Sequence, residues 1–453
     1  MIRLFRVVLP ASILTLFISE ALLLVASYAL AAYFDADLNE HPFELDQQGW
    51  QSIAIMAALL LSVMYLTRMY SDLRNAGPIR LMQSLAFAMG VALLAQAVFT
   101  YLKLDWALPQ RIMIRGGMLA CILLFGWRLL FSAAIRHKIG LRRVLFIGWS
   151  PVVADLIDHL NLHPELGFTP IGYLNHHQTK NAPPANVAYF GSMAALRGVL
   201  EEQRPDWIVI GDRSLIAPNV VDDLLELRFG GVQTEAAAGF YEKICGRICL
   251  AEIQPRQMIF SRSLQPDPLR VRLQSMYSTA IVLLSLPITL PLFLFFALMV
   301  RLGSKGPVMA REYRVGIHGS VFYSYRFRST EYGSHPPRLT GIGKVLTRFG
   351  LDGLPQIWNV FRGHMSFVGP DPDPPEFASI LGKAIPIYGQ RASIRPGITG
   401  WAQINQRAEG SIGDAIRRSE YDLYYVENLS PLLDFFVLLS WFRDAILHGD
   451  FPA

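Results

Sequence analysis

The chain has 453 residues, enough for two or three folding units, and 52% of them are hydrophobic while only 17% are charged. Soluble domains carry about 25% charged residues, so the composition argues against a wholly soluble protein and indicates contact with lipid. A formal net charge of +5 is small for this length and gives no indication of nucleic-acid binding.

Four apolar stretches open the chain, at about residues 8–33, 51–67, 81–102 and 112–135. Each is close to the about 20 residues that a helix needs to cross the hydrocarbon core of a bilayer. Lys and Arg lie before the first stretch, between the second and third and after the fourth, whereas the first loop holds acidic residues and no basic one. Because short basic loops stay in the cytoplasm, residues 1–138 are expected to form a multi-pass four-helix transmembrane bundle with both ends cytoplasmic.

Glu20 lies in the middle of the first stretch, where an ionised carboxylate is costly. It either has a functional role, or it is protonated or bonded to a neighbouring helix. A transporter usually has more than one such group, and the four stretches show no second charge that pairs with Glu20. The sequence therefore argues against a small-molecule transporter.

From about residue 141 the pattern changes to short β-rich runs that alternate with helical ones. This alternation predicts an open parallel sheet, so a Rossmann-like α/β domain is expected at residues 139–262. The first strand ends in G-W-S-P, with Ser150 and Val153 in place of two glycines of a dinucleotide fingerprint. We therefore expect a structural or regulatory domain rather than an NAD site.

A fifth apolar stretch, from about residue 276 to 300, is interrupted by Pro287 and Pro291. Proline removes a helical hydrogen bond and clashes with the preceding turn, so a kink is expected. Basic residues flank both ends of the stretch, and the positive-inside rule then keeps both ends in the cytoplasm. The pattern predicts a re-entrant membrane helix at about residues 273–301, with an ordinary fifth span as the alternative.

Six sequence blocks follow this helix. They are YRVG (313–316), YRFRS (325–329), PRLTGIGK (337–344), LDGLPQIWNVFRGHMSFVGP (351–370), RPGITGWAQIN (395–405) and YDLYYVENLS (421–430). The blocks resemble the catalytic domain of the bacterial sugar transferase family, the monotopic phosphoglycosyl transferases, which implies an α+β catalytic-type domain at residues 263–453. With the four spans and the middle domain, the layout resembles the large polyprenyl-phosphate hexose-1-phosphate transferases of the bacterial inner membrane, whose soluble domains lie in the cytoplasm.

The resemblance implies a reaction that begins exopolysaccharide or other surface-glycan synthesis. Such proteins use Mg²⁺ and transfer a sugar-1-phosphate from a UDP-sugar to undecaprenyl phosphate, through a covalent intermediate on an aspartate. The position that matches this nucleophile is Asp352. Positions that match phosphate-binding arginines of the family, or lysines in the last two cases, are Arg314, Arg328, Arg338, Arg391, Arg326 and Arg362. The resemblance does not identify the sugar, and it leaves open whether the protein forms a homo-oligomer.

The match fails at several positions of the active site. The family motif D-E-L-P-Q reads D-G-L-P-Q, so Gly353 replaces a glutamate that helps to hold magnesium, and Asp371 replaces the arginine of G-P-R-P. Three further exchanges put other residues in place of a glutamine, an aspartate and an arginine: Glu312, Pro337 and Thr347, the last beside Arg348. Either Asp371 or Glu312 has taken over the metal, or the protein is a catalytically degenerate partner that binds or scaffolds in the same pathway.

Overall fold

The structure is a computed structural model. Its chain divides into two compact units, residues 9–235 and residues 236–453. Of the first eight residues, 1–2 belong to the first unit and 3–8 to the second. The second unit includes helix α8 (Ala237–Cys245), which the predicted boundary at residue 262 assigns to the middle domain. Two short strands, β1 (Ile2–Leu4) and β2 (Val7–Leu9), pair near the N-terminus. The structure describes residues 2–4, 7–9, 11–38, 45–67, 69–70, 78–101, 108–137, 142–163, 166–175, 187–212, 218–252, 264–333, 338–385, 387–406 and 412–448.

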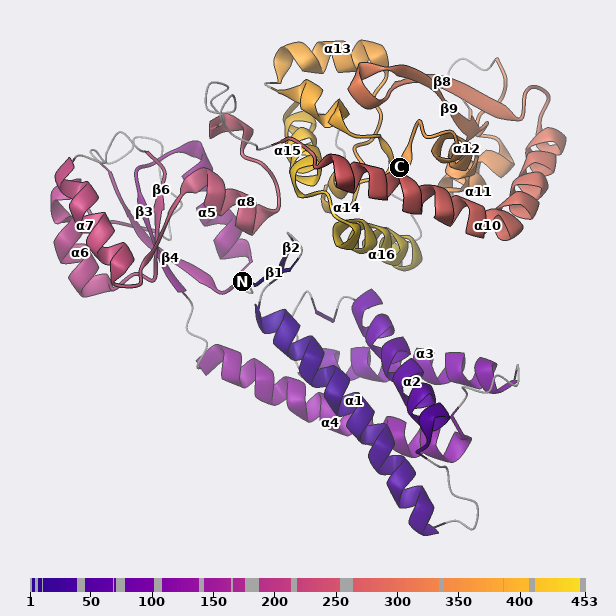
Figure 1. Cartoon of the computed structure of the whole chain (residues 1–453), viewed down its shortest axis with the longest axis horizontal. Coiled ribbons are helices and arrows are strands. Elements are labelled where there is room, and N and C mark those ends of the chain that lie inside the picture. Colours follow the sequence, from indigo (N-terminus) through magenta and orange to yellow (C-terminus); the bar gives the residue numbers. More distant parts are fainter. Residues whose placement is uncertain are drawn as a thin grey trace. The chain divides into compact units, whose positions relative to one another are not determined.

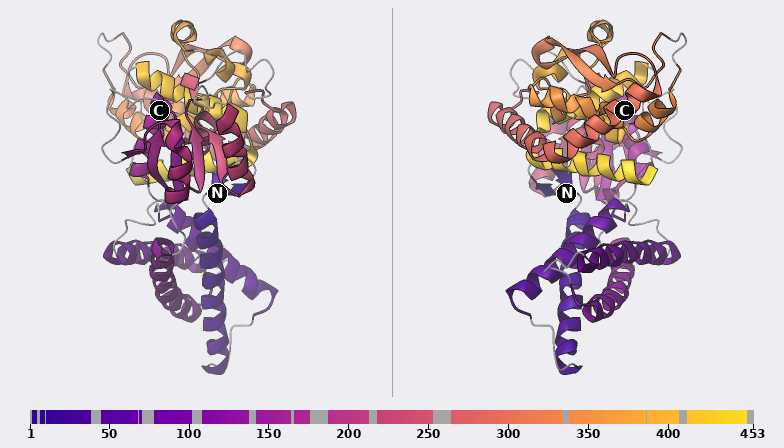
Figure 2. Two further views of the ribbon diagram at one scale, coloured as in Figure 1. Left: turned by 90° about the vertical axis from the view of Figure 1, so that its left-hand side faces the viewer. Right: turned by 90° about the vertical axis from the view of Figure 1, so that its right-hand side faces the viewer.

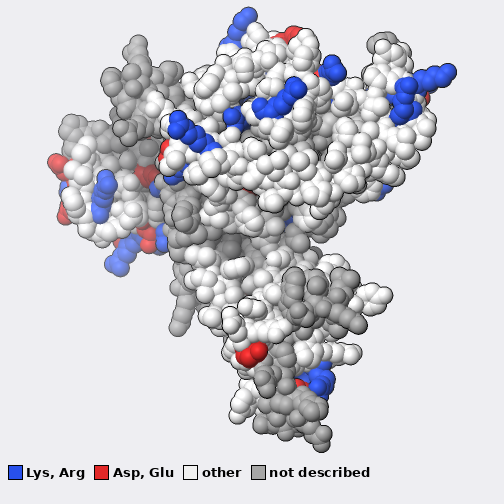
Figure 3. All heavy atoms as spheres, turned by 45° about the vertical axis from the view of Figure 1, so that its right-hand side comes forward, with Lys and Arg blue, Asp and Glu red and all other residues white. Residues whose placement is uncertain are grey.

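The apolar N-terminal stretches form four long helices that share one hydrophobic core. They are α1 (Ala11–Leu38), α2 (Gln47–Leu66), α3 (Pro78–Tyr101) and α4 (Gln110–His137). Each is long and apolar enough to cross a membrane, as is a fifth helix in the second unit. Their outer faces leave large apolar side chains such as Leu22 and Leu130 exposed, and Figure 3 shows few charged side chains on this part of the surface. Exposed apolar faces of this extent indicate contact with lipid.

A buried ion pair joins α1 to α4. The Glu20 side chain, 0% exposed, accepts hydrogen bonds from Nε and Nη2 of Arg128 at 2.5 and 3.1 Å. The Tyr70 hydroxyl donates to the same carboxylate at 2.6 Å, and Arg128 also donates to the Met69 carbonyl at 3.0 Å. The expectation that the apolar stretches lack paired charges is therefore wrong. Glu20 is bonded to a neighbouring helix, as one of the two interpretations of the sequence proposes.

The rest of the first unit is a five-stranded sheet in the order β5-β4-β3-β6-β7, with parallel pairing of β3 to β4 and β6 and of β4 to β5. Helices α6 and α7 share a core with Leu145 and Ile147 on one face, and Figures 1 and 2 show α5 on the other. Ser150 caps α5 by accepting a hydrogen bond from the Val153 amide. The elements are β3 (Arg142–Ile147), α5 (Pro151–Leu162), β4 (Phe168–Leu174), β5 (Ala188–Tyr189), η2 (Met193–Ala195), α6 (Leu196–Gln203), β6 (Trp207–Ile210), α7 (Pro218–Phe229) and β7 (Gln233–Ala236).

The second unit packs helices and two small two-stranded sheets around the apolar helix α10. Its elements after α8 are η4 (Leu250–Glu252), α10 (Pro268–Gly303), β8 (Met309–Val315), η5 (Ile317–Gly319), β9 (Val321–Phe327), α11 (Gly341–Arg348), η6 (Leu351–Gln356), α12 (Ile357–Phe361), β10 (Ser366–Val368), α13 (Pro375–Ala384), η7 (Tyr388–Ser393), β11 (Gly397–Thr399), α14 (Trp401–Asn405), α15 (Ile412–Asn428) and α16 (Pro431–His448). Strands β8 and β9 form an antiparallel hairpin, and β10 pairs with β11 in parallel.

Helix α10 is anchored to the second unit at both ends. Near its start, the Gln274 amide donates to the Val368 carbonyl at 3.1 Å and to the Asp434 carboxylate at 2.9 Å. Near its end, Val300 packs against Phe327 in a separate core cluster. A straight helix of 36 residues is about 54 Å long, and in Figure 1 the axis of α10 changes direction along its length. Pro287 and Pro291 lie inside the helix and provide the physical cause for such a bend.

Candidate active site around Asp352

Asp352 lies in the first turn of η6, directly after a tight turn at Gly350. Gly350 has a φ of 61°, a left-handed conformation that favours glycine, and it ends the segment that follows α11. The Asp352 side chain is 16% exposed, and its Oδ2 accepts a hydrogen bond from Arg326 Nη1 at 3.4 Å. The predicted nucleophile is thus close to the surface and next to one of the predicted phosphate-binding arginines.

The hairpin β8–β9 fixes this pair in position. The buried Gln356 and Asn359 side chains, one at the end of η6 and one on α12, bond to β9. Gln356 donates to the Ser324 hydroxyl at 3.3 Å, and Asn359 donates to the Tyr323 carbonyl at 2.6 Å. Since Arg326 is on the same strand as Ser324, these contacts set the distance between Arg326 and Asp352.

Glu312 lies on the same face of the hairpin as Arg326. Glu312 pairs directly with Ser324, while Arg326 pairs with Ala310. Glu312 and Arg326 are therefore diagonal neighbours, whose Cα atoms are about 7 Å apart in an antiparallel pair of strands. Glu312 is 49% exposed and accepts a hydrogen bond from Arg314, which also donates to the Pro372 carbonyl at 3.0 Å. Glu312 is therefore an accessible carboxylate on the side of the hairpin that faces Asp352.

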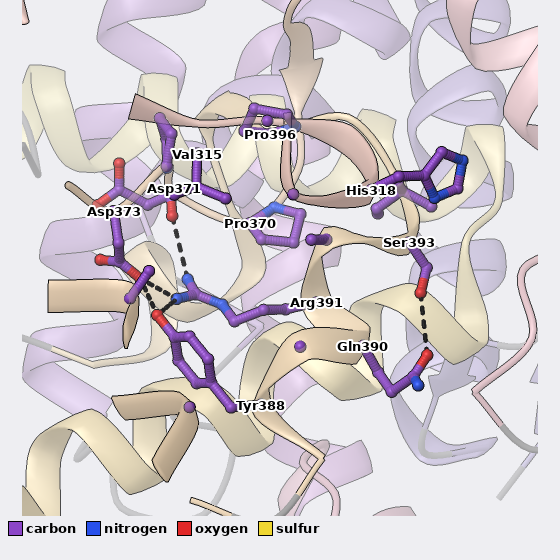
Figure 4. A pocket seen from close by; sticks show the side chains of 18 residues that line it. Val315, His318, Pro370, Asp371, Asp373, Tyr388, Gln390, Arg391, Ser393 and Pro396 are labelled. Atoms are coloured by element: carbon purple, nitrogen blue, oxygen red, sulfur yellow. Dashed lines mark hydrogen bonds and ion pairs between the residues drawn. The ribbon is translucent and has the colours of Figure 1, made fainter. Parts of the chain in front are cut away.

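Arg391 is the centre of a buried charge cluster at the other predicted site loop, as Figure 4 shows. The side chain is 7% exposed and donates to the Asp373 carboxylate, to Asp422 Oδ2 at 2.5 Å, to the Tyr388 hydroxyl at 2.6 Å and to the Asp371 carbonyl at 3.0 Å. Burial alone would raise the pKa of Asp373, but the neighbouring guanidinium groups outweigh it and hold that pKa below its usual range. Arg391 therefore holds the loop together and has little capacity left for a substrate.

Asp371, one of the two candidate metal ligands, is directed toward another arginine. Its Oδ2 accepts a hydrogen bond from Arg418 Nη2 at 2.9 Å, and the same guanidinium also contacts Asp373 Oδ1 at 3.2 Å. A carboxylate that is neutralised in this way is a poor magnesium ligand, because the metal would have to displace the guanidinium. Glu312 is ion-paired in the same way, with Arg314, but its side chain is more exposed, 49% against 29% for Asp371.

The remaining predicted arginines have different roles. Arg328 is buried and donates to the Ser304 and Lys305 carbonyls at 3.0 and 2.8 Å, so it caps the end of α10. Arg362 is exposed and lies over the Trp358 ring, 5.0 Å from its centroid. Arg338 is exposed on the segment before α11, and Pro337 lies outside the described residues. Arg326 is thus the predicted phosphate ligand that the structure places next to Asp352.

The donors around Asp352 suit a magnesium ion only if a substrate supplies further oxygens. Among the residues that the structure describes, no three His, Cys, Asp or Glu side chains gather as a metal-binding group. Mg²⁺ in phosphoryl-transfer sites is usually held by one or two carboxylates together with substrate phosphates and water. The two carboxylates on this side of the hairpin, Asp352 and Glu312, are ion-paired with Arg326 and Arg314, so a divalent ion would compete with those guanidinium groups.

Two pockets in the described part of the second unit lie near these elements. One, the Arg391 cleft, has a volume of about 610 Å³ and is lined by the hairpin turn and by the loops that carry Asp371 and Arg391. The other, the α10 pocket, has a volume of about 450 Å³ and is lined by α10, the hairpin, η6 and α12. Residues that line the α10 pocket include Leu354 and Pro355, which follow Asp352 in η6.

Comparison with known proteins gives the family. Residues 270–447 match the family described as bacterial sugar transferase, and residues 66–210 match one described as a CoA-binding domain. An exopolysaccharide production protein, PSS, of Rhizobium leguminosarum bv. phaseoli is 34% identical over 175 residues, which cover 35% of this chain and 88% of that protein. The chain belongs to the bacterial sugar transferase family. The resemblance found in the six sequence blocks is confirmed.

Two longer relatives of this bacterial sugar transferase carry more specific names. The UDP-N-acetylgalactosamine-undecaprenyl-phosphate N-acetylgalactosaminephosphotransferase of Aeromonas hydrophila is 33% identical over 218 residues, 46% of this chain and 51% of that protein. The UDP-glucose:undecaprenyl-phosphate glucose-1-phosphate transferase of Xanthomonas campestris pv. campestris is 39% identical over 162 residues, 33% of this chain and 34% of that protein. The alignments thus span about half and about a third of these two relatives.

Two partners that hold the site of this bacterial sugar transferase in place could not be predicted from the sequence. Arg418, which contacts Asp371, and Asp422, which contacts Arg391, both lie on α15. Asp422 is in the block YDLYYVENLS, so the block match could have drawn attention to it. No pattern singles out Arg418, because it lies 47 residues from Asp371 and its neighbours give no sign of that contact.

Proposed function

We propose that this protein transfers a sugar-1-phosphate from a UDP-sugar to undecaprenyl phosphate and so begins the synthesis of exopolysaccharide or another surface glycan. The proposal depends on one observation above all: Asp352 is present, partly exposed and held next to Arg326. The named relatives from Aeromonas and Xanthomonas act on UDP-sugars and undecaprenyl phosphate, which supports the same substrate classes here.

The proposed chemistry has two displacements at phosphorus. First, an Asp352 carboxylate oxygen attacks the β-phosphorus of the UDP-sugar, the bond from that phosphorus to the bridging oxygen breaks, and UMP leaves with the bond electrons. Then an oxygen of the lipid phosphate attacks the same phosphorus, and Asp352 leaves again as a carboxylate. A carboxylate suits both steps because it is anionic at neutral pH and is a competent leaving group.

Arg326 has the position to stabilise the charge of the phosphoryl group during both steps. Its guanidinium is near the Asp352 carboxylate and is about one-third exposed, so part of its donor capacity can reach a phosphate. We further propose that Glu312, once its contact with Arg314 is broken, would help Asp352 to hold Mg²⁺ in place of the glutamate lost at Gly353. When bound, such an ion neutralises charge on the phosphate oxygens.

The membrane layout is a second part of the proposal. The shared core of α1–α4 supports a four-helix transmembrane bundle, and the anchoring of both ends of α10 in one unit supports a re-entrant helix rather than a fifth span. Both soluble parts would then face the cytoplasm at the bacterial inner membrane. A homo-oligomer is compatible with this layout.

The direct test is UMP release by the purified full chain in nanodiscs, with a panel of UDP-sugars, undecaprenyl phosphate and Mg²⁺. The wild type should release UMP, and Asp352→Asn should abolish release, since an amide is not a nucleophile of this kind. Gly353→Glu should fold, because a Cβ at Gly353 has its nearest contact, Gln356 Oε1, at an ordinary 3.4 Å. It should increase release if the lost glutamate limits the rate.

An inactive wild type would point to the alternative role. A folded preparation that releases no UMP with any sugar of the panel, and in which Gly353→Glu restores release, would identify a catalytically degenerate partner in the same pathway. Equal release by the wild type and Asp352→Asn would instead refute the role of Asp352.

A further inference from the structure

Helix α7 of the α/β domain has two apolar faces. Its inner face packs on the sheet, where Val220 and Leu224 are buried in the domain core. Its outer face carries Val221, Leu225 and Phe229, which are 39%, 43% and 86% exposed and are called here the α7 stripe. A helix at the surface of a domain normally buries one apolar stripe and presents polar side chains on its other side. The α7 stripe therefore goes beyond what the core of the domain requires.

The α7 stripe is a continuous feature of one helix. Its three residues are four positions apart, so they lie on one side of α7 and turn by about 40° at each step. They are three of the four large hydrophobic side chains that are exposed in the described part of residues 142–236, and the fourth is Leu162 on α5. Single exposed hydrophobic residues are common on protein surfaces, whereas a contiguous set indicates an interaction site.

Charged side chains of opposite sign border the two sides of the α7 stripe. At 100° per residue, Asp222 and Glu226 lie about 60° and about 100° from Leu225 in one direction around the helix. Arg228 lies about 60° from Leu225 in the other direction. All three charged side chains are exposed. An apolar stripe with one acidic edge and one basic edge is complementary to a second copy of itself.

The two edges determine the direction in which the helices of two copies run. If two α7 helices pack stripe to stripe around a two-fold axis along the helices, the acidic edge of each lies beside the basic edge of the other. Glu226 and Arg228 of the partner subunit are then two residues apart in height, about 3 Å along the axis. With the two-fold axis across the helices, the two acidic edges would meet and repel each other. Parallel helices are therefore the favoured arrangement.

The size of the α7 stripe fits a contact between copies in one membrane. Three side chains cover less than the about 1,600 Å² that a stable complex of two soluble proteins typically buries. The chain also has helices that are long and apolar enough to span a membrane, and these would hold all copies in one plane. Confinement to a plane raises the effective concentration of the copies, so a small interface is sufficient.

We propose that the α7 stripe is the contact surface between two copies of this chain, which pack with their α7 helices side by side and in the same direction. Leu225 would lie against its counterpart at the centre, and Glu226 and Arg228 would pair along both edges. The inference does not depend on the proposed function, because α7 contributes no residue to the candidate active site.

The first experiment measures the fraction of dimer by single-molecule photobleaching of the labelled full chain in liposomes, over a series of protein-to-lipid ratios. Leu225→Glu should raise the protein density needed for half dimerisation at least about ten-fold, because it places a carboxylate inside the contact. Leu162→Glu is the matched control, since Leu162 is 75% exposed on α5 and lies outside the stripe. It should dimerise like the wild type.

The second experiment tests the charged edges in the same assay. Glu226→Arg and Arg228→Glu should each raise the density needed for half dimerisation about three-fold, because each places like charges beside each other on both edges. The double variant should return to the wild-type value, since it exchanges the signs of the two edges. A stronger dimer in Glu226→Arg alone would contradict the parallel arrangement, because only antiparallel helices bring two acidic edges together.

The third experiment locates the contact by oxidative crosslinking in the same liposomes. Parallel helices place Val221 beside its counterpart, so Val221→Cys should form a disulfide-linked dimer. Antiparallel helices would place Val221 opposite Phe229, about 12 Å along the axis from its own counterpart. The wild type, with its free Cys121, Cys245 and Cys249, gives the background level of crosslinking. Leu162→Cys should not exceed that level.

Three results would overturn the inference. One is a chain that stays monomeric at every protein-to-lipid ratio. The second is an equal effect of Leu225→Glu and Leu162→Glu, and the third is a dimer that forms while Val221→Cys crosslinks no more than the wild type. In a monomer, a nitroxide label at position 225 that collides with oxygen but not with a water-soluble nickel complex would assign the stripe to the membrane surface instead. None of these readouts requires UMP release, so the inference and the proposed function can fail separately.

Discussion

Replacing Arg391 by glutamine is expected to destabilise the second unit strongly rather than to weaken substrate binding selectively. The sequence blocks assign Arg391 to phosphate binding, but the side chain is buried and its hydrogen bonds go to Asp373, Asp422, Tyr388 and the Asp371 carbonyl. The glutamine variant would leave the buried Asp422 without its ion-pair partner and Asp373 with Arg418 alone. Burial already raises the pKa of Asp422 despite the attraction of Arg391, so this carboxylate depends on the guanidinium to stay ionised.

The size of the effect follows from the burial of the cluster. Removing one partner of a buried ion pair costs about 3–5 kcal/mol, and a domain is stable by about 5–15 kcal/mol. The loss therefore lowers the ratio of folded to unfolded protein about a hundred-fold to several-thousand-fold. Arg362→Gln is the control, because Arg362 was also predicted to bind phosphate. The Arg362 side chain is exposed, and the contact described for it is with the Trp358 ring. Such a cation–π contact contributes about 0.5–1 kcal/mol.

Pulse proteolysis of the full chain in nanodiscs across a urea series measures this difference. The midpoint of Arg391→Gln should fall well below that of the wild type, and that of Arg362→Gln should stay close to it. Arg391→Gln combined with Asp422→Asn should recover part of the loss, because it removes one uncompensated charge. An unchanged midpoint for Arg391→Gln, together with a raised KM for the UDP-sugar, would refute the structural role and restore the phosphate-binding one.

Three more predictions concern other buried groups. Burial raises the pKa of Asp434 from 3.8 to about 6. The stability that this group contributes is therefore complete below pH 3.8 and is lost as the pH rises through 6, a change of about 3 kcal/mol in the free energy of unfolding. Asp434→Asn should remove this pH dependence, measured as thermal midpoints between about pH 4 and 8. Gly343→Ala should destabilise the second unit by at least about 3 kcal/mol in urea unfolding, because the new Cβ would lie 1.8 Å from the Ser329 carbonyl oxygen. Glu20→Gln should lower the aggregation temperature in detergent, because it leaves Arg128 buried without its counter-charge, and a Glu20→Gln, Arg128→Gln double variant should be more stable than the single one.

The long elements were predictable from the sequence because hydropathy acts over many residues. The stretches expected at about 8–33 and 112–135 correspond to α1 (Ala11–Leu38) and α4 (Gln110–His137), which extend a few residues further into polar sequence. The alternation of strand and helix patterns after residue 141 likewise gave a parallel sheet. Helix ends were less accurate, since capping and tertiary contacts decide them rather than hydropathy.

The roles of single charged residues were harder to predict. Arg328 and Arg391 match phosphate-binding positions, yet their partners are the Ser304 and Lys305 carbonyls in one case and carboxylates up to 31 residues away in the other. Arg128 was missed because one arginine within an apolar helix gives no sign of its partner on another helix. Sequence blocks show which residues a site needs, whereas only the fold shows which of them are buried and already bonded.

The most direct test of the central claim is intact-protein mass spectrometry of the full chain after incubation with UDP-sugars and Mg²⁺ and without a lipid acceptor. The proposed mechanism predicts a mass gain of one sugar-phosphate, located on the peptide that contains Asp352 and absent from Asp352→Asn. Addition of undecaprenyl phosphate should discharge the adduct and return the unmodified mass. UMP release by the wild type with no adduct at any time point, or an adduct on a different residue, would contradict the assignment of Asp352 as the nucleophile.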